Sequence, residues 1–407
     1  MVGERNMTEY RFIRPIDVLF VRGNRLFGGP GDYGESLMPP RPSLFAGALR
    51  SKMLAAHPQE LAAFVEQCPL GDEALRMSLG SAQEPGDFRL SFVALAARGT
   101  DHIDWFLPLP ADVIGTTQEE GENNTLKLNY LIPHPMDRRI QCATPLPSLP
   151  VCRSAKQTKP VAGLWLNAEG VSIYLNGEKL SNEHVVHTRQ LWKKDSRLGI
   201  ALSPTARAAE EGRIYTSDAV ALASGGTDDR NGVGFLVGVQ GAHGRLPENG
   251  LLRLGGDGRG AEMDSVALDL PKPTLDRIQE ERRFRMVLTS PGLFQRGWLP
   301  DGCVEQDGAY CLQLPGFSAR LIAASVPRGE IISGWDLLRR KPKPAQRVAP
   351  TGSVYWFDEC EGDPGVLQKL VDTGLWPDED TSIDRQRHAE GFNHVLIGCW
   401  AKKQEGV

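Results

Sequence analysis

The sequence has no long apolar run and no apolar leader segment. None of its 407 residues belongs to a stretch near the ~20 apolar residues that a membrane-spanning helix needs. The first residues, MVGERNMTEYRF, are polar and contain no apolar core of a secretory signal. We therefore expect a soluble, cytoplasmic protein that makes no contact with a membrane.

Metal-binding patterns are also missing. The seven cysteines form no CxxC pair and have no close histidine partners, and an odd number without pattern is typical of reduced thiols. His184 and His187 are three residues apart, but no third ligand lies near them in the sequence. These patterns predict that the protein has neither a metal site nor a cofactor.

Catalytic signatures are equally scarce. The sequence has no GxSxG, no HExxH and no P-loop, because no GK[ST] follows its Gly-rich segments. His388 and His394 flank a late Gly-containing loop, where a nuclease could place a general base, but no partner for acid–base cleavage is evident. We predict that the protein is not an enzyme, with a metal-independent endoribonuclease as the alternative.

The composition is that of a globular protein: 41% of the residues are hydrophobic and 24% are charged. The 44 glycines and 29 prolines have no fixed period, so they indicate turns and shaped loops. The net charge of −5 argues mildly against a nucleic-acid partner, because such proteins are usually basic. An RNA-binding role therefore requires that the basic residues cluster.

Hydrophobic patterns predict a chain of strands with few helices. An aromatic and β-branched strand over 10–21 precedes a Gly-rich loop and a helix for which Ser43 is the expected N-cap. The segment 112–158 has the character of an irregular insertion. Further strands are expected at 88–95, 171–175, 213–216, 233–239 and 263–270.

The two ends of the chain echo each other. The strand that begins at Tyr10 has a counterpart at Phe284, and each half closes with a Gly-containing loop that leads into a strand. A charged helix or linker over 275–283 lies between them. We therefore predict two related α+β domains, 1–280 with insertions and 281–407.

The most basic segment lies between residues 335 and 353. Its cations have no acidic residue between them, and Pro342 and Pro344 keep the chain extended, so the charges can follow a phosphate backbone. The alternative is a solvated surface. The candidate RNA-binding residues here are Arg339, Arg340, Lys341, Lys343 and Arg347.

Two other segments are candidates for RNA contact. In the Gly-rich segment 254–260, glycines allow close approach to a phosphate and arginines can neutralise its charge, although a plain β-turn explains the same residues. The start of the helix near Ser43 offers free N–H donors; an ordinary capped core helix is the alternative. The candidate residues are Arg41, Ser43, Arg50 and Lys52 at the helix, and Arg253, Gly255, Gly256 and Arg259 at the loop.

Taken in order, several motifs resemble the RAMP superfamily of CRISPR proteins. The opening strand, Gly-rich loop and PPRPSLFAGALR helix, together with SRLGIAL, EGRIYT and LRLGG, are similar to that superfamily. GWDLL, PKP and PTGSVYWF, with FRMVLTSPGLF and the following GW, resemble the third subunit of the type III-B, or Cmr, RNA-silencing complex. The resemblance runs from about Tyr10 to Trp400. The last Gly loop departs from the pattern, because Phe392 follows Gly391 where RAMP proteins often have another glycine.

This resemblance implies a fold, a role and partners. It implies two ferredoxin-like, RRM-like domains with Gly-rich loops and insertions. It also implies a non-catalytic ribonucleoprotein subunit of antiviral defence, which binds the repeat-derived 5′ handle of the guide RNA. The implied partners are that guide RNA, the large polymerase/cyclase-like subunit, an adjacent backbone RAMP subunit and, indirectly, target RNA. A RAMP endoribonuclease that processes precursor guide RNA is the alternative, and a subunit that binds only proteins is a third possibility.

Overall fold

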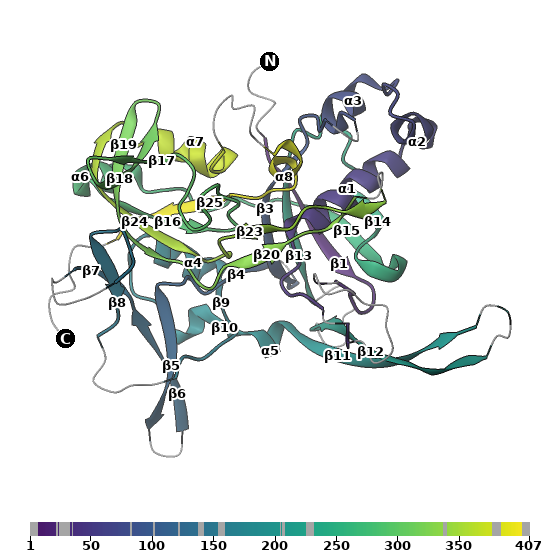
Figure 1. Cartoon of the computed structure of the whole chain (residues 1–407), viewed down its shortest axis with the longest axis horizontal. Coiled ribbons are helices and arrows are strands. Elements are labelled where there is room, and N and C mark those ends of the chain that lie inside the picture. The colour runs from purple at the N-terminus through teal and green to yellow at the C-terminus, as the bar shows by residue number, and fades with distance from the viewer. Residues whose placement is uncertain are drawn as a thin grey trace.

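The computed structural model describes residues 7–21, 23, 33–34, 36–81, 84–100, 102–120, 123–136, 142–153, 159–203, 205, 208–224, 232–336, 340–376 and 384–400. It is a mixed α/β protein in which antiparallel sheets dominate (Figure 1). The helices of these residues are α1 (Pro42–Ala55), α2 (Pro58–Val65), α3 (Glu73–Leu79), α4 (Ala168–Leu175), α5 (Thr188–Leu191), α6 (Leu275–Glu281), α7 (Val366–Thr373) and α8 (Arg385–Ala389).

The first half of the chain forms an eight-stranded sheet, in which every pair of neighbours is antiparallel. Its strands, in spatial order, are β10 (Val185–His187), β9 (Leu164–Asn167), β4 (Ile103–Pro108), β3 (Arg89–Arg98), β13 (Gly232–Gln240), β1 (Glu9–Pro15), β15 (Gly260–Val266) and β14 (Asn249–Arg253).

The second half forms a six-stranded antiparallel sheet. Its order is β17 (Cys303–Gln306), β18 (Ala309–Leu314), β19 (Phe317–Ser325), β24 (Val354–Gly362), β16 (Phe284–Leu288) and β25 (Val395–Gly398). Each sheet contains four neighbouring strands, β15–β1–β13–β3 in the first and β25–β16–β24–β19 in the second. In both sets the spatial order is the fourth, first, third and second strand along the chain. The echoed segments at Tyr10 and Phe284 are therefore in equivalent strands, β1 and β16.

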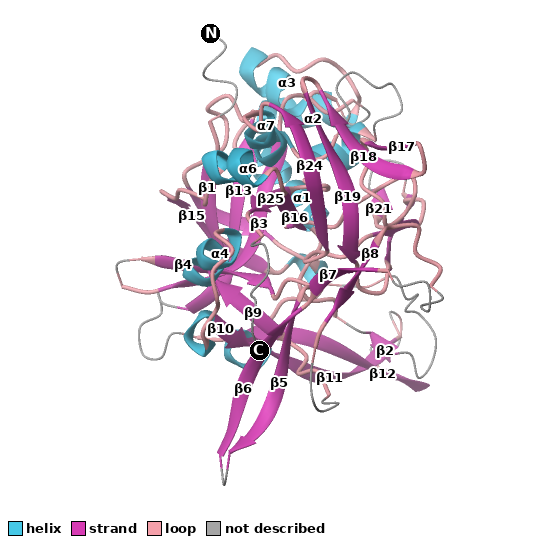
Figure 2. Ribbon diagram, turned by 90° about the vertical axis from the view of Figure 1, so that its left-hand side faces the viewer, coloured by secondary structure: helices cyan, strands magenta, loops and turns pink. Residues whose placement is uncertain are grey.

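Several hairpins leave these sheets. β11 (Trp192–Leu202) and β12 (Ala209–Leu222) form a long arm with β2 (Tyr33–Gly34), at the lower right of Figure 1. β5 (Val113–Glu120) and β6 (Asn123–Tyr130) project from the body in Figures 1 and 2. The others are β7 (Ile132–Pro135) with β8 (Ser148–Val151), β20 (Glu330–Ile332) with β23 (Gln346–Val348), and β21 (Trp335–Asp336) with β22 (Lys341–Pro342).

Alternate side chains of the central strands build separate cores. In β1, Ile13 packs with α1 residues such as Phe45 on one side of the sheet. Phe12 belongs instead to a core that also contains Trp356 of the second sheet. Burial on both sides follows from the period of two along a strand. The two halves therefore share one of their hydrophobic cores, while the second sheet packs its other face on Leu367 of α7 and its neighbours.

A buried polar cluster crosses this shared core. The Arg285 guanidinium on β16 lies 3.2 Å from the Asp112 carboxylate and 3.5 Å from the centre of the Tyr174 ring on α4. It also donates to the Tyr174 backbone carbonyl, and the Tyr174 hydroxyl donates to Asp112 at 2.7 Å. Burial raises the pKa of Asp112, although Arg285 opposes that shift. The cluster thus holds charged groups from both halves away from water.

Three expectations about local structure were wrong. Residues 171–175 lie in helix α4, because the Asn167 side chain accepts from the Gly170 N–H at 2.8 Å and caps its start. The segment 112–158 contains two hairpins where an irregular insertion was expected. Helix α1 begins at Pro42, so Ser43 lies inside its first turn and Arg41 occupies the N-cap position. The strands expected near 88–95, 213–216 and 233–239 and the helix expected within 275–283 are confirmed. The strands expected over 10–21 and 263–270 form only in part, because they end at Pro15 and Val266. No helix within the described ranges is long and apolar enough to cross a membrane.

We expect Arg285→Met to lower the free energy of unfolding by about 3–5 kcal/mol, because it leaves the Asp112 carboxylate buried without its cation. Denaturant unfolding at neutral pH measures this change. The control is Arg253→Met, since Arg253 is exposed. The double variant Arg285→Met/Asp112→Asn, which removes both charges, should recover part of the stability; equal stability of Arg285→Met and the control would contradict this account.

Candidate nucleic-acid interface

The basic segment forms an extended hairpin. Strand β20 pairs with β23, with Ile331 opposite Arg347, and β21 continues the hairpin by pairing Trp335 with Pro342 of β22. Ile332 and Val348 turn inward and are buried with Phe392. The alternate residues Ile331 and Arg347 are exposed. The hairpin is therefore anchored by one face and leaves the other open.

Three of the predicted cations on this hairpin are free to contact a phosphate. Arg340, Lys341 and Arg347 are exposed, and none of them has an ion-pair partner among the described residues. Lys343 is different, because its ammonium lies 2.6 Å from the Glu390 carboxylate. Arg339 lies outside the described residues.

Trp335 is a further candidate contact, which the basic run alone did not indicate. Its side chain is 56% exposed, which is unusual for so large an apolar group, and it lies across the hairpin from Pro342 beside Lys341. Aromatic rings next to cations are the usual means by which proteins hold single-stranded nucleic acid. A tryptophan at the border of a basic run was the available signal in the sequence.

Arg41 connects the helix segment to this hairpin. Its guanidinium lies 2.5 Å from the carboxylate of Glu330 at the start of β20. The residues that lead into α1 therefore lie against the base of the hairpin, although they are far apart in the sequence. Ser43, next to Pro42 in the first turn, is half-buried and makes no capping hydrogen bond.

The side chains of Arg50 and Lys52 contact parts of the first half and not the hairpin. Arg50 donates to the Leu79 carbonyl at 3.2 Å, and burial lowers the pKa of its guanidinium. The Lys52 ammonium lies beside Gly250 of β14, 2.9 Å from where a Cβ on that glycine would be. The helix segment therefore brings only Arg41 to the hairpin.

The Gly-rich loop before β15 packs on the chain that follows β1. Gly255 has φ +81°, and a Cβ there would lie 2.6 Å from the Phe20 carbonyl. The Gly256 N–H donates to that same carbonyl at 2.8 Å. Arg259 forms an ion pair of 2.7 Å with Asp17 and lies over the Phe20 ring, whereas Arg253 is exposed and has no partner among the described residues.

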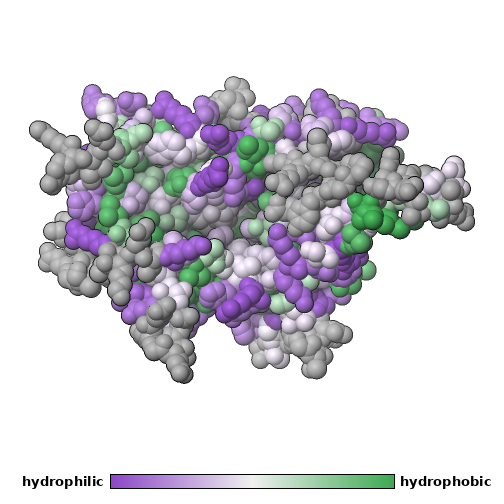
Figure 3. Space-filling model, turned by 60° about the horizontal axis from the view of Figure 1, so that its bottom comes forward, coloured by the Kyte–Doolittle hydropathy of each residue, from purple (hydrophilic) through white to green (hydrophobic). Residues whose placement is uncertain are grey.

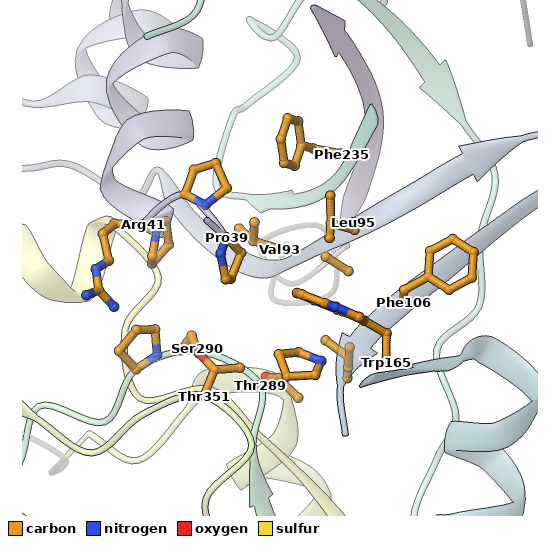
Figure 4. A pocket seen from close by; sticks show the side chains of 16 residues that line it. Pro39, Arg41, Val93, Leu95, Phe106, Trp165, Phe235, Thr289, Ser290 and Thr351 are labelled. Atoms are coloured by element: carbon orange, nitrogen blue, oxygen red, sulfur yellow. The ribbon is translucent and has the colours of Figure 1, made fainter. Parts of the chain in front are cut away.

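A cavity lies beside Arg41 between the two halves. Its volume is about 450 Å³, and it adjoins a smaller pocket of about 50 Å³ with which it shares Arg41 and Trp165 (Figure 4). Glu330 and Thr351 come from the second half, and the rest of the lining comes from the first. Its walls are of mixed character: most of the lining residues are apolar, and Arg41, Thr188, Glu330 and Thr351 add polar groups. The apolar residues include Met38, Pro39, Pro108, Pro110, Leu164, Trp165 and Trp192.

Exposed cations lie on the elements that border this cavity. Arg189 and Lys193 are exposed and have no partner among the described residues, and their chain neighbours Thr188 and Trp192 line the cavity. Lys194 lies 3.5 Å from Asp218. This group was not among the predicted RNA contacts, because Asp195 interrupts its basic run, whereas 339–347 contains no acidic residue.

Neither histidine of the last Gly loop presents a free ring. His394 is 2% exposed, and its Nε2 donates to the Leu90 carbonyl at 2.8 Å. His388 packs on Trp376 with the ring centres 5.1 Å apart. Burial lowers the pKa of both imidazoles to about 4, and the charge of Arg89 adds to this shift. His394 is therefore not accessible to an RNA substrate in this structure.

These shifts predict a pH dependence of stability. An unfolded imidazole binds a proton near pH 6.5, whereas the folded protein resists protonation down to about pH 4. The free energy of unfolding should therefore fall between these two pH values as the pH decreases. His394→Gln keeps an N–H donor for Leu90 and removes the titrating ring, so its unfolding curves should depend less on pH in that window; an unchanged dependence would contradict the assignment.

No group of three or more His, Cys, Asp or Glu side chains that could hold a metal ion occurs within the residues that the structure describes. The seven cysteines are free thiols. Burial raises the pKa of the Cys303 and Cys360 thiols to about 12. These two thiols therefore stay protonated at neutral pH and are poor nucleophiles.

A family model described as "CRISPR-associated protein (Cas_Cmr3)" matches residues 11–400. The match covers nearly the whole chain, which is therefore a CRISPR-associated protein. More specifically, the chain belongs to the Cmr3 family and is a subunit of the type III-B Cmr complex, as the resemblance predicted. Members of this family are in general non-catalytic subunits of the complex.

Similar chains occur in cryo-EM structures of the type III-B Cmr-beta complex bound to cognate target RNA, with and without AMPPnP. Both have a TM-score of 0.49 and 14% identity; the alignments cover 95% of this chain and 95% or 96% of the other. A chain from the apo state has a TM-score of 0.29 and 12% identity, over 65% of this chain and 99% of the other. No curated protein sequence matches the chain.

Proposed function

We propose that this Cmr3-family subunit holds the repeat-derived 5′ handle of the guide RNA without cutting it. The observation that carries the proposal is the hairpin of β20–β23 and β21–β22, which presents Lys341, Arg347 and Trp335 to solvent on a buried base. An extended series of cations suits a phosphate backbone, and an exposed ring suits unpaired bases. The negative net charge of the chain does not oppose this, because the cations of this hairpin are concentrated on one segment.

The proposal includes the domain organisation. Both halves contain four antiparallel strands in the order fourth, first, third, second, which is the strand order of a ferredoxin-like domain. The first connection contains α1 to α3 in the N-terminal half, whereas the β17–β18 hairpin takes that place in the C-terminal half. We place the boundary near residue 280, within or just after α6, so that the domains comprise 1–280 and 281–407.

The long arm supports the proposed contacts with protein partners. Leu198, Ile200 and Leu202 alternate on one face of β11, Ile214 lies opposite Ile200, and all four are exposed. Figure 3 shows hydrophobic side chains gathered at the right, where this arm extends. Exposed apolar surface of this kind favours a protein interface. We propose that such surfaces link the large polymerase/cyclase-like subunit to the adjacent backbone RAMP subunit.

The alternative is a RAMP endoribonuclease that processes precursor guide RNA. It requires a general base that reaches the RNA, and His394 is buried with its Nε2 hydrogen-bonded to Leu90. His388 is half-buried and has a strongly lowered pKa. These environments favour the non-catalytic role.

The double variant Lys341→Glu/Arg347→Glu should weaken binding of a labelled repeat-derived RNA. It should also flatten the salt dependence of binding, by about 0.7 in the log–log slope for each phosphate that the protein no longer neutralises. Fluorescence anisotropy at several salt concentrations measures both quantities. Lys179→Glu/Lys272→Glu is the matched control, because both lysines are exposed and the charge change is the same.

Equal affinities and slopes for the two double variants would remove the hairpin from the RNA site. The same RNA, run on a denaturing gel after incubation with wild-type protein, should stay intact. Specific cleavage that His388→Ala abolishes would favour the endoribonuclease instead.

A further inference from the structure

We propose that the cavity between Arg41 and Trp192 receives one unstacked nucleobase of the bound RNA. This inference rests on the proposed function and assigns to it a site that the basic hairpin alone does not provide. The volume of about 450 Å³ lies within the ~300–1,000 Å³ of pockets that bind small ligands. A single base held in such a pocket would fix the register of the RNA on this subunit.

The walls of the cavity suit a flat aromatic ligand. Trp165 and Trp192 meet edge to face, with ring centres 5.2 Å apart, and both line the cavity. The Trp165 Nε1 donates to the Thr188 hydroxyl at 3.0 Å, which fixes that ring. Trp192 is half-buried, so part of its surface is open to a ligand. Stacking on aromatic side chains is the usual way in which proteins hold bases splayed out of single-stranded RNA.

The rim offers hydrogen-bonding groups to the edge of a base. The Arg41–Glu330 ion pair lies at the cavity, with side chains 20% and 43% exposed. Figure 4 shows Arg41 at one end of the adjoining pocket and Trp165 near the other. The guanidinium has further N–H donors, and the carboxylate accepts from ring N–H and amino groups. A base thus meets a donor and an acceptor side by side.

Charge around the cavity favours RNA over a protein side chain. Arg189 and Lys193, both exposed and without a partner among the described residues, adjoin the lining residues Thr188 and Trp192. On the opposite side of the cavity, Glu330 is the first residue of β20, and Arg347 lies on the paired strand β23, opposite Ile331. Cations on both sides of a cavity that combines aromatic walls with polar groups match a nucleotide, whose base is flat and whose phosphates are anionic.

An abasic scan tests this proposal with the wild-type chain. The probes are a short single-stranded RNA of the repeat-derived handle and a series of versions of it, each lacking one base. We expect a position, separate from any base that Trp335 contacts, at which removal of the base weakens binding about tenfold, the usual effect of removing one stacked base. Trp192→Ala should weaken binding of the intact RNA similarly and should no longer distinguish that abasic probe. Trp192→Phe should keep most of the discrimination, and Trp335→Ala, as the control, should leave it intact.

The outcomes separate this proposal from the proposed function. If the wild-type chain binds the intact RNA and all abasic probes equally, the cavity holds no base while RNA binding stands. Loss of discrimination in Trp335→Ala and not in Trp192→Ala would place the base on the hairpin and overturn the proposal. No binding of any probe would contradict the proposed function itself. If Trp192→Ala does not fold, the wild-type chain is tested instead with RNA that carries 2-aminopurine at the sensitive position. Stacking on the tryptophans should quench its fluorescence. Unquenched fluorescence would overturn the proposal.

Discussion

The buried contact of Arg285 with Asp112 and Tyr174 holds the two halves of the molecule together in one arrangement. It joins β16, an inner strand of the second sheet, to α4 and to the chain that begins β5 in the first half. Buried charges are stable only with their partners in place, so this cluster disfavours other packings of the two sheets. Because the hairpin after β19 belongs to the second half, its position over Arg41 depends on this arrangement. The cavity depends on it too, since Glu330 and Thr351 form its walls together with residues of the first half.

Ion pairing within the chain decides which cations remain for a partner. Arg259 is paired with Asp17, Arg41 with Glu330 and Lys343 with Glu390. Exposed cations without partners among the described residues remain on the β20–β23 and β21–β22 hairpin and at the start of the β11–β12 arm. An acidic protein therefore presents local basic surfaces on two hairpins, which is what a subunit needs if RNA occupies one face and proteins occupy others.

Strands were predicted well because alternation is a local signal. β1, β3, β13 and β16 follow from their own residues, and the echo between Tyr10 and Phe284 pointed to equivalent strands of the two sheets. The wrong prediction of a strand at 171–175 has a local cause too. Val171 and Ile173 favour a strand, but the hydrogen bond from the Gly170 N–H to the Asn167 side chain caps and stabilises a helix. The pairing of cations could not be predicted in this way, because Asp17 and Arg259 are 242 positions apart in the sequence. The same holds for the cavity, whose walls come from segments spread over both halves.

The central claim is that RNA lies along the β20–β23 hairpin and the adjoining cavity. Photocrosslinking of the assembled complex on its guide RNA, followed by mass spectrometry of the crosslinked peptides, tests it most directly. The account predicts crosslinks to the handle nucleotides within 330–348, with Trp335 among the modified residues, and within 187–197. Crosslinks confined to the Gly-rich loop at 254–260, or the absence of any crosslink to this subunit, would contradict it.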